Sequence, residues 1–186
     1  MQTTTILKEE HRALRHVLQQ LETLADDVRR RGRLDESAVA RCLESLRRFD
    51  DGCHQTKEEH LLRRAAARAL EAGAAAELAR CACRHDGQAR LLTAVGSELD
   101  LALAGDSMAL DRFVNRARDY VGLQRRHAEL EERELFPLLE RLLAGADQDE
   151  LLAGFERIER GFGRRRAPGP GQKGPLGRLP EPAPIG

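Results

Sequence analysis

The sequence is poor in the residues that build β-sheets, and this shortage points to a helical protein. Its 186 residues include no tryptophan, one tyrosine and five phenylalanines. A buried core must therefore consist mainly of leucine and alanine, which favour helices over strands. A chain of this length suits one domain, or one domain with an appendage.

Three further absences limit where the protein is expected to act. No apolar run approaches the roughly 20 residues needed to span a bilayer. The first ten residues turn acidic and lack a secretory hydrophobic stretch. The 31 basic and 31 acidic residues balance, which gives no electrostatic reason to expect nucleic acid or a membrane surface as a partner. We therefore expect a cytoplasmic protein.

The cysteines do not form a recognisable disulfide or zinc framework. Cys42, Cys53, Cys81 and Cys83 include no C-x-x-C pair, and the side chains of Cys81 and Cys83 would point apart on a helix. We expect four free thiols, as is usual in a reducing cytoplasm.

Proline separates an ordered body from a tail. Residues 1–136 contain no proline, which permits long helices, whereas six of the seven prolines follow Gly163. The tail, residues 163–186, is rich in proline and glycine and carries five basic residues against one acidic residue. We predict that the tail is disordered because it has almost nothing to bury. The body is predicted to be a bundle over residues 1–145 with an accessory helix over 146–162.

Apolar residues recur at helical spacing in four long blocks. The blocks cover residues 7–28, 36–72, 78–102 and 110–142, and a fifth, shorter pattern covers about 147–162. Four long amphipathic helices with short connections predict an all-α fold. We expect an antiparallel up-down-up-down four-helix bundle with the fifth helix packed outside it.

Polar side chains interrupt these apolar stripes in a repeated pattern. Each of the four stripes contains a histidine, and two of the histidines are followed four residues later by a glutamate on the same helical face. The six residues are His11, His54, Glu58, His85, His127 and Glu131. A buried ionised carboxylate without a partner costs several kcal/mol. Four imidazoles and two carboxylates in one interior therefore predict a bound metal ion.

The positions of the histidines along the helices favour one shared site. His11 and His85 lie early in their helices, whereas His54 and His127 lie past the middle of theirs. In an antiparallel bundle these positions can meet in one layer. Two similar halves, each with one histidine and one His-x-x-x-Glu pair, suit a centre of two metal ions bridged by carboxylates.

Other interpretations of these residues stay open. Glu59 could replace Glu58, and Glu132 could replace Glu131, after a slight rotation of the helix. Any single histidine could be an ordinary core residue with a hydrogen bond. The Glu-x-x-His pairs of ferritin-type sites and the His-Glu-x-x-His motif of zinc proteases do not occur in the sequence.

Four segments around these residues follow one another in a specific order. They are Glu10-His11, residues 49–59 (FDDGCHQTKEE), Arg84-His85-Asp86 and residues 127–137 (HAELEERELFP). This array resembles the hemerythrin-like (HHE cation-binding) domain over roughly residues 4–145. The resemblance implies an antiparallel four-helix bundle that holds two iron ions in an oxo- or hydroxo-bridged centre. It also implies a kink at Pro137, just beyond the ligands.

The sequence departs from the oxygen-carrying hemerythrins at two positions. Those proteins have a second histidine on the third helix where this chain has Ala89, and an aspartate where it has Glu132. The set of four histidines and two glutamates is more similar to bacterial HHE proteins linked to nitrosative and oxidative stress. The iron-sulfur-repair proteins among them begin with a cysteine-containing segment, whereas this chain begins directly with its first predicted helix.

The resemblance implies a di-iron protein that reacts with small oxidants or gases, namely O₂, peroxide or NO, in a stress response. Fewer imidazoles leave more open positions on the metal, which favours reaction over reversible O₂ binding. A non-catalytic iron or oxygen sensor, an iron-storage module and a metal-free interaction module stay open, as does the question whether the protein is an enzyme. Manganese or zinc could replace iron. Tyr120 and Cys81 could contribute to the site or be plain core residues.

Overall fold

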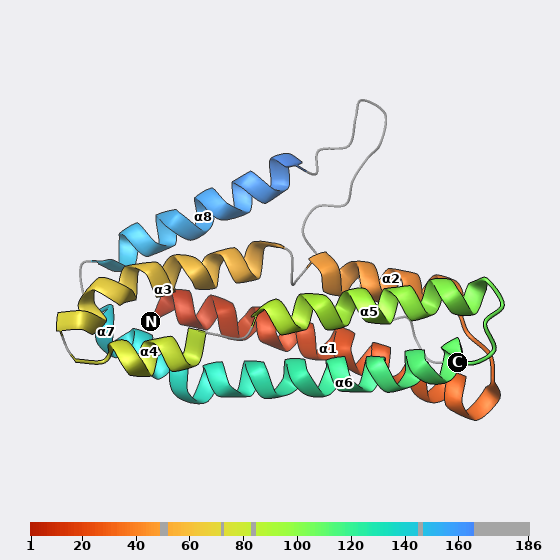
Figure 1. The fold of residues 1–186 in the computed structure, drawn as a ribbon. Helices are drawn as coiled ribbons and strands as arrows, with labels where there is room; N and C mark the ends of the chain where they lie inside the picture. Colours follow the sequence, from red (N-terminus) through yellow and green to blue (C-terminus); the bar gives the residue numbers. More distant parts are fainter. Residues whose placement is uncertain (49–51, 72, 83–84, 145–146, 166–186) are drawn as a thin grey trace.

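The proline-free part of the chain folds into helices, as its apolar spacing predicts. The computed structural model describes residues 1–48, 52–71, 73–82, 85–144 and 147–165 (Figure 1). These described residues contain no strand, so the predicted all-α class is confirmed for them. The elements are α1 (Gln2–Arg31), α2 (Glu36–Arg48), α3 (His54–Glu71), α4 (Ala75–Ala82), α5 (His85–Leu103), α6 (Ala109–Leu130), the π-helical turn η2 (Glu131–Leu135), α7 (Phe136–Leu142) and α8 (Asp147–Arg165).

The first helix shows how the apolar pattern becomes structure. Residues on one face of α1 are buried at steps of three and four, from Leu7 to Val28. Burying each leucine side chain contributes about 1.5–3 kcal/mol. The helix ends at Gly32, which adopts φ 62° and donates its N–H to the carbonyl of Val28. A left-handed residue of this kind favours glycine and stops the helix.

Neighbouring helices of the body run in opposite directions. Along α1 the contacts run backwards through the α6–α7 segment, from Thr4–Glu140 through Glu22–Arg125 to Asp26–Arg118. Helices α5 and α6 pair in the same way, through Gln88–Gln124 and Glu98–Arg116. Helices α2 and α3 pass α1 in reverse order, through Cys42–Val17 and His54–Glu10. Figure 1 shows α6 lying lengthwise beside α5, and α6 also packs against α1.

Two of the predicted long helices each consist of two shorter ones. The block predicted over residues 36–72 corresponds to α2 and α3, and the block predicted over 78–102 corresponds to α4 and α5. The junction residues 49–51 and 83–84 lie outside the described part. The block predicted over 110–142 is continuous through α6, η2 and α7.

The kink predicted at Pro137 takes the form of a π-helical turn just before it. In η2 the N–H of Phe136 bonds the carbonyl of Glu131, five residues earlier. Proline has no N–H and its ring crowds the carbonyl four residues before it. A wider turn relieves this crowding, and such turns are common at functional sites. Glu131 lies at the start of the turn.

A polar layer divides the apolar interior into two clusters. One cluster includes Leu14, Leu18, Leu43 and Phe113, between α1, α2, α5 and α6. The second cluster includes residues such as Leu7, Leu61, Leu135 and Phe155, between the start of α1 and α3, α4, α7 and α8. On α1, His11 falls between Leu7 of the second cluster and Leu14 of the first. The predicted ligand layer therefore lies between the two apolar clusters.

The last helix, α8, packs against α3 and α1 (Figure 1). It extends to Arg165 and not only to residue 162. Gly163 costs a helix only about 1 kcal/mol, and Arg164 and Arg165 favour a helix C-terminus. Residues 163–165 are therefore helical, whereas residues 166–186 of the predicted disordered tail lie outside the described part.

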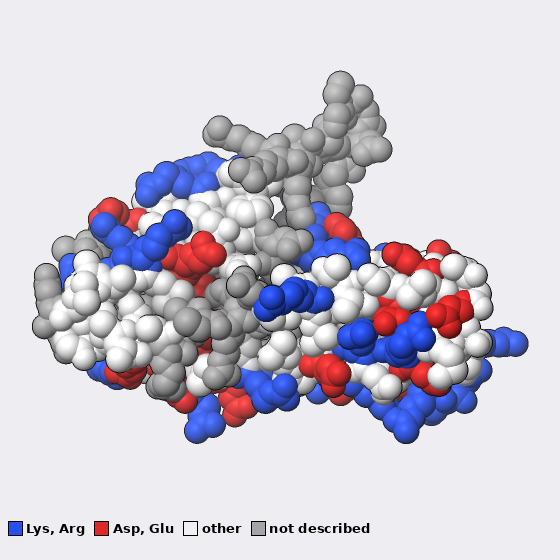
Figure 2. Space-filling view, in the orientation of Figure 1, with Lys and Arg blue, Asp and Glu red and all other residues white. Residues whose placement is uncertain are grey.

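The remaining surface features agree with the balanced charge of the sequence. Figure 2 shows basic and acidic side chains interspersed over the visible face. None of the described helices combines the length and apolar character that a membrane crossing requires.

Cys42 and Cys53 are free thiols, as predicted. The side chains of Cys81 and Cys83 lie outside the described part.

Candidate metal centre

The polar layer brings together five of the six predicted ligand residues. The side chains of His11, His54, Glu58, His127 and Glu131 are all buried. They form two overlapping groups, His11–His54–Glu131 and Glu58–His127–Glu131, and within each group the candidate ligand atoms lie within 4.8 Å of one another. The sixth residue, His85, begins α5, but its side chain lies outside the described part.

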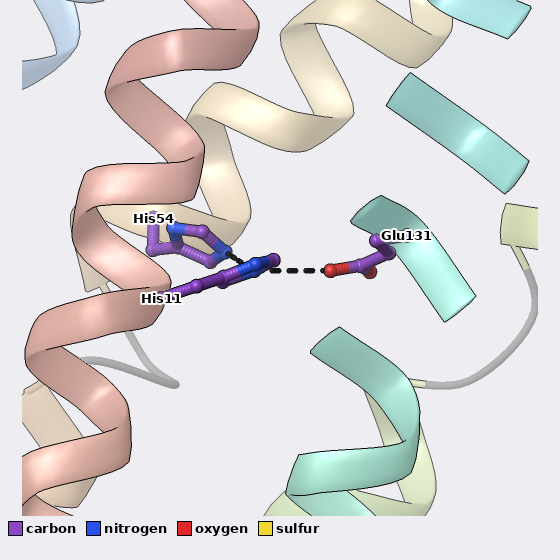
Figure 3. Close-up of side chains that lie close together, drawn as sticks. All are labelled: His11, His54 and Glu131. Carbon is purple, nitrogen blue, oxygen red and sulfur yellow. Dashed lines mark hydrogen bonds and ion pairs between the residues drawn. The ribbon is translucent and has the colours of Figure 1, made fainter. Parts of the chain in front are cut away.

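Glu131 belongs to both groups and directs one oxygen toward each. Its Oε2 lies 3.2 Å from Nε2 of His11, and its Oε1 lies 2.6 Å from Nε2 of His127. Figure 3 shows His11, His54 and Glu131 pointing toward one another from α1, α3 and η2. A carboxylate shared in this way has the arrangement of a bridging ligand between two metal positions.

The outer ring nitrogen, Nδ1, of His54 and of His11 also contacts a carboxylate. Glu10 Oε2 lies 2.7 Å from Nδ1 of His54, and Glu132 Oε1 lies 3.0 Å from Nδ1 of His11. Burial raises the pKa of Glu10, but the hydrogen bonds and charges of His54 and Lys57 outweigh it and the pKa is lowered. Burial also raises the pKa of Glu132, and there Arg15 and His11 outweigh it, so that this pKa is lowered too.

These ionised carboxylates determine which imidazole nitrogen carries the proton. A carboxylate only accepts hydrogen bonds, so Nδ1 of His11 and Nδ1 of His54 must each donate. Burial lowers the pKa of His54 and favours its neutral form. Its Nε2 therefore presents a lone pair to the interior. The same carboxylate-histidine arrangement orients histidine ligands in metal sites.

The inward-facing atoms of the layer need a cation between them, either a proton or a metal ion. Nε2 of His11 and Nε2 of His54 lie 3.1 Å apart, and Glu131 Oε2 lies 3.2 Å from the former. Without a proton or a metal ion between them, lone pairs at this distance repel, and burial increases the cost of an uncompensated charge. Imidazole nitrogen and carboxylate oxygen suit iron, manganese and zinc. The residues therefore fit a metal centre.

Comparison with known families agrees with this chemistry. A model of the hemerythrin HHE cation binding domain matches residues 2–139 of the chain. This chain belongs to the hemerythrin HHE family. Neither a curated protein nor a solved structure matches it. The resemblance inferred from the sequence motifs is thereby confirmed, together with cation binding as the general property of the domain.

The structure distinguishes between the glutamates that lie next to each other in this HHE domain. Glu58 is buried, whereas Glu59 is exposed. Glu131 faces the interior, whereas Glu132 contacts Nδ1 of His11 from the outer side and also binds Arg15, with its carboxylate 2.6 Å from the guanidinium. Glu58 and Glu131 thus hold the inner positions, and Glu132 has a supporting position.

The third-helix position that holds a second histidine in the oxygen-carrying relatives faces outward in this HHE domain. Ala89 is exposed, and Gln88 is the buried residue of this turn. Its Nε2 donates to Oε1 of Gln124 at 3.2 Å, and Gln124 Nε2 donates to the hydroxyl of Tyr120 at 3.0 Å. The Tyr120 phenol therefore belongs to a buried hydrogen-bonded chain of amides. Cys81, the other side chain considered for the site, lies outside the described part.

Three charged residues near the layer were missed by reasoning from the sequence. Glu10 binds His54, and Lys57 is 2% exposed and binds both Glu10 and Glu159 of α8. The position of Lys57 between His54 and Glu58 was a signal, because a lysine within a ligand motif requires an acidic partner when it is buried. Glu159 had no such signal, since its contact depends on how α8 packs.

Proposed function

We propose that this HHE domain binds two iron ions between the helices of an antiparallel four-helix bundle. His11 and His54 would hold one ion, Glu58 and His127 the other, and Glu131 would bridge them. His85, at the start of α5, would complete the ligand set. The observation that carries the proposal is the buried cluster of three ligand-type atoms in which Nε2 of His11 lies 3.1 Å from Nε2 of His54 and 3.2 Å from Oε2 of Glu131.

The proposed activity is reaction with a small oxidant or gas, namely O₂, peroxide or NO, in a cytoplasmic response to oxidative or nitrosative stress. Bound iron would supply the redox chemistry for such ligands. The chain's own residues orient the imidazoles through Glu10 and Glu132, and the apolar clusters on both sides keep bulk water from the layer. A buried layer of this kind suits small ligands such as these.

Metal analysis of matched histidine variants tests the ligand assignment. His54→Ala should lower the iron content of the purified protein substantially, because His54 contributes one of the inward nitrogens. His16→Ala is the control, since His16 is an exposed histidine of α1. Equal iron content in the two variants would contradict the assignment.

Turnover measurements test the proposed reactivity separately. The iron-loaded chain should consume peroxide or NO at a rate that depends on iron content, and H54A should lose this activity together with its metal. Full iron content without consumption of either compound would instead favour a sensor or storage module. A metal-dependent gain in stability would then be the property to follow.

A further inference from the structure

We propose that α8, which lies beyond the part matched by the HHE family, is a positioning element for the metal centre. The inference rests on the proposed function, because it concerns how one ligand of the proposed centre is held. Glu159 of α8 acts on His54 through two intervening side chains, Lys57 and Glu10. The family match ends at residue 139, whereas α8 begins at Asp147.

The four residues form a continuous chain of short contacts. Glu159 Oε1 lies 2.7 Å from Lys57 Nζ, and Lys57 Nζ donates to Glu10 Oε1 at 2.5 Å. The other oxygen of Glu10, Oε2, lies 2.7 Å from Nδ1 of His54. An uninterrupted path of hydrogen bonds and ion pairs therefore leads from the outer helix to the imidazole.

Helix α8 also covers the charged centre of this path. The ammonium of Lys57 lies 5.5 Å from the ring centroid of Phe155, one turn before Glu159 on α8. A lysine that is 2% exposed requires compensation by carboxylates. Two carboxylates supply it here, one from α1 and one from α8.

The charge balance of Lys57 decides how strongly Glu10 can act on His54. With Glu159 present, the ammonium is shared between two carboxylates. Without Glu159, its full charge would act on Glu10 and make Glu10 a weaker acceptor for Nδ1 of His54. A weaker hydrogen bond at Nδ1 lowers the donor strength of Nε2 and loosens the orientation of the ring. Metal affinity at His54 should therefore fall when the charge of Glu159 is removed.

A second ion pair between α3 and α8 supplies a matched control. Glu150 of α8 pairs with Arg64 of α3, and neither residue belongs to the path formed by Glu159, Lys57, Glu10 and His54. Glu150 and Glu159 have similar exposure, 58% and 53%. Glu159→Gln and Glu150→Gln each remove one ion pair that fastens α8 to α3. Only E159Q lies on the path to the metal centre.

The test is cobalt(II) binding by the full chain. Cobalt(II) reports its ligands through visible d–d absorption, which a merely structural role of Glu159 would not change. We expect E159Q to weaken cobalt binding by about 3–10-fold, less than the 10–100-fold typical of groups that contact a ligand directly, and to shift the absorption bands. E150Q should bind as the unaltered chain does, and Glu159→Asp should restore most of the affinity.

The possible results separate this inference from the proposed function. Equal affinities and spectra for E159Q and E150Q, with normal binding by the unaltered chain, would overturn only the role of α8. Absence of cobalt binding by the unaltered chain would contradict the metal centre and, with it, this inference. Thermal unfolding of the metal-free variants measures the loss of each ion pair separately, and E159Q should destabilise more than E150Q because Lys57 is 2% exposed whereas Arg64 is 39% exposed.

Discussion

The imidazoles of His11 and His54 face each other through Nε2 atoms 3.1 Å apart. The Nδ1 atom of each ring is hydrogen-bonded to a carboxylate, Glu132 at His11 and Glu10 at His54. An arrangement that protonates both outer nitrogens and leaves the inner ones as acceptors is unfavourable in a dry interior. It becomes favourable when a cation accepts electron pairs from both rings.

The first prediction concerns stability in the presence of metal. Metal binds the folded layer and not the unfolded chain, so a concentration 100 times the dissociation constant should stabilise one site by about 2.7 kcal/mol. Thermal unfolding with and without zinc should show a higher midpoint with the metal. His127→Ala removes one inward nitrogen and should reduce this gain, whereas a gain equal to that of the unaltered chain would show that His127 is not a ligand.

The second prediction concerns acid sensitivity of the metal-free protein. Burial lowers the pKa of His54 below the ordinary value for histidine, about 6.5, so near this pH the unfolded chain binds more protons than the folded one. Stability should therefore fall as the pH drops below about 6.5, with a slope of up to about 1.4 kcal/mol per pH unit for one proton. The loss ends once the pH is below the folded pKa.

Chemical unfolding at several pH values in the presence of a chelator measures this effect. His54→Gln should flatten the stability curve between about pH 7 and pH 5, and His16→Gln, at an exposed position, should leave it unchanged. At lower pH a second loss is expected in the unaltered chain and in His16→Gln, and a smaller one in His54→Gln, which lacks the imidazole beside Glu10. The pKa of Glu10 is lowered from 4.5 despite burial, because His54 and Lys57 stabilise its charge, so that protonation removes this contribution as the pH falls below about 4.5.

The third prediction concerns the end of α1. Gly32 has a positive φ of 62° and open space around its Cα, so Gly32→Ala should destabilise the fold by about 1–2 kcal/mol through backbone strain alone. Gly161 lies within α8, also with open space and without a positive φ. Gly161→Ala should instead stabilise by about 0.5–1 kcal/mol. Thermal midpoints that shift in the same direction for both variants would contradict this account of the two glycines.

The inward-facing residues of the site could be predicted from the sequence because helical spacing determines which side chains share a face. His127 and Glu131 lie four residues apart, and the apolar residues before and after them indicate the buried side. The antiparallel order of the helices then brings His11 and His54 to the same depth. The match between the two His-x-x-x-Glu pairs favoured Glu58 over Glu59, and the structure buries the former and exposes the latter.

The supporting residues could not be predicted in this way, because their roles depend on contacts between helices. Glu10 and Glu132 each lie next to a layer residue in the sequence, about 100° away around the helix, where a carboxylate can face solvent or a neighbouring helix. The contact between Lys57 and Glu159 requires the position of α8 against α3. The apolar stripe of α8 predicts that this helix packs, but not which charged residues it places together.

The π-helical turn also lay beyond sequence reasoning. Pro137 predicts a disturbance of the helix, but several local geometries can accommodate a proline, which has no N–H to donate. In the structure the N–H of Phe136 bonds the carbonyl of Glu131, five residues earlier, and this spacing defines a π-helical turn. The turn therefore begins at Glu131, the residue shared by both halves of the layer.

The most direct test of the account is the ratio of metal to protein after anaerobic loading with iron(II) and removal of excess metal. The unaltered chain should hold two irons, and Glu131→Ala should hold fewer than one, because Glu131 belongs to both ligand groups. Glu59→Ala changes an exposed glutamate next to Glu58, and this variant should still hold two irons. Two irons retained by E131A, or none held by the unaltered chain, would contradict the claim that these buried acceptors are assembled around metal ions.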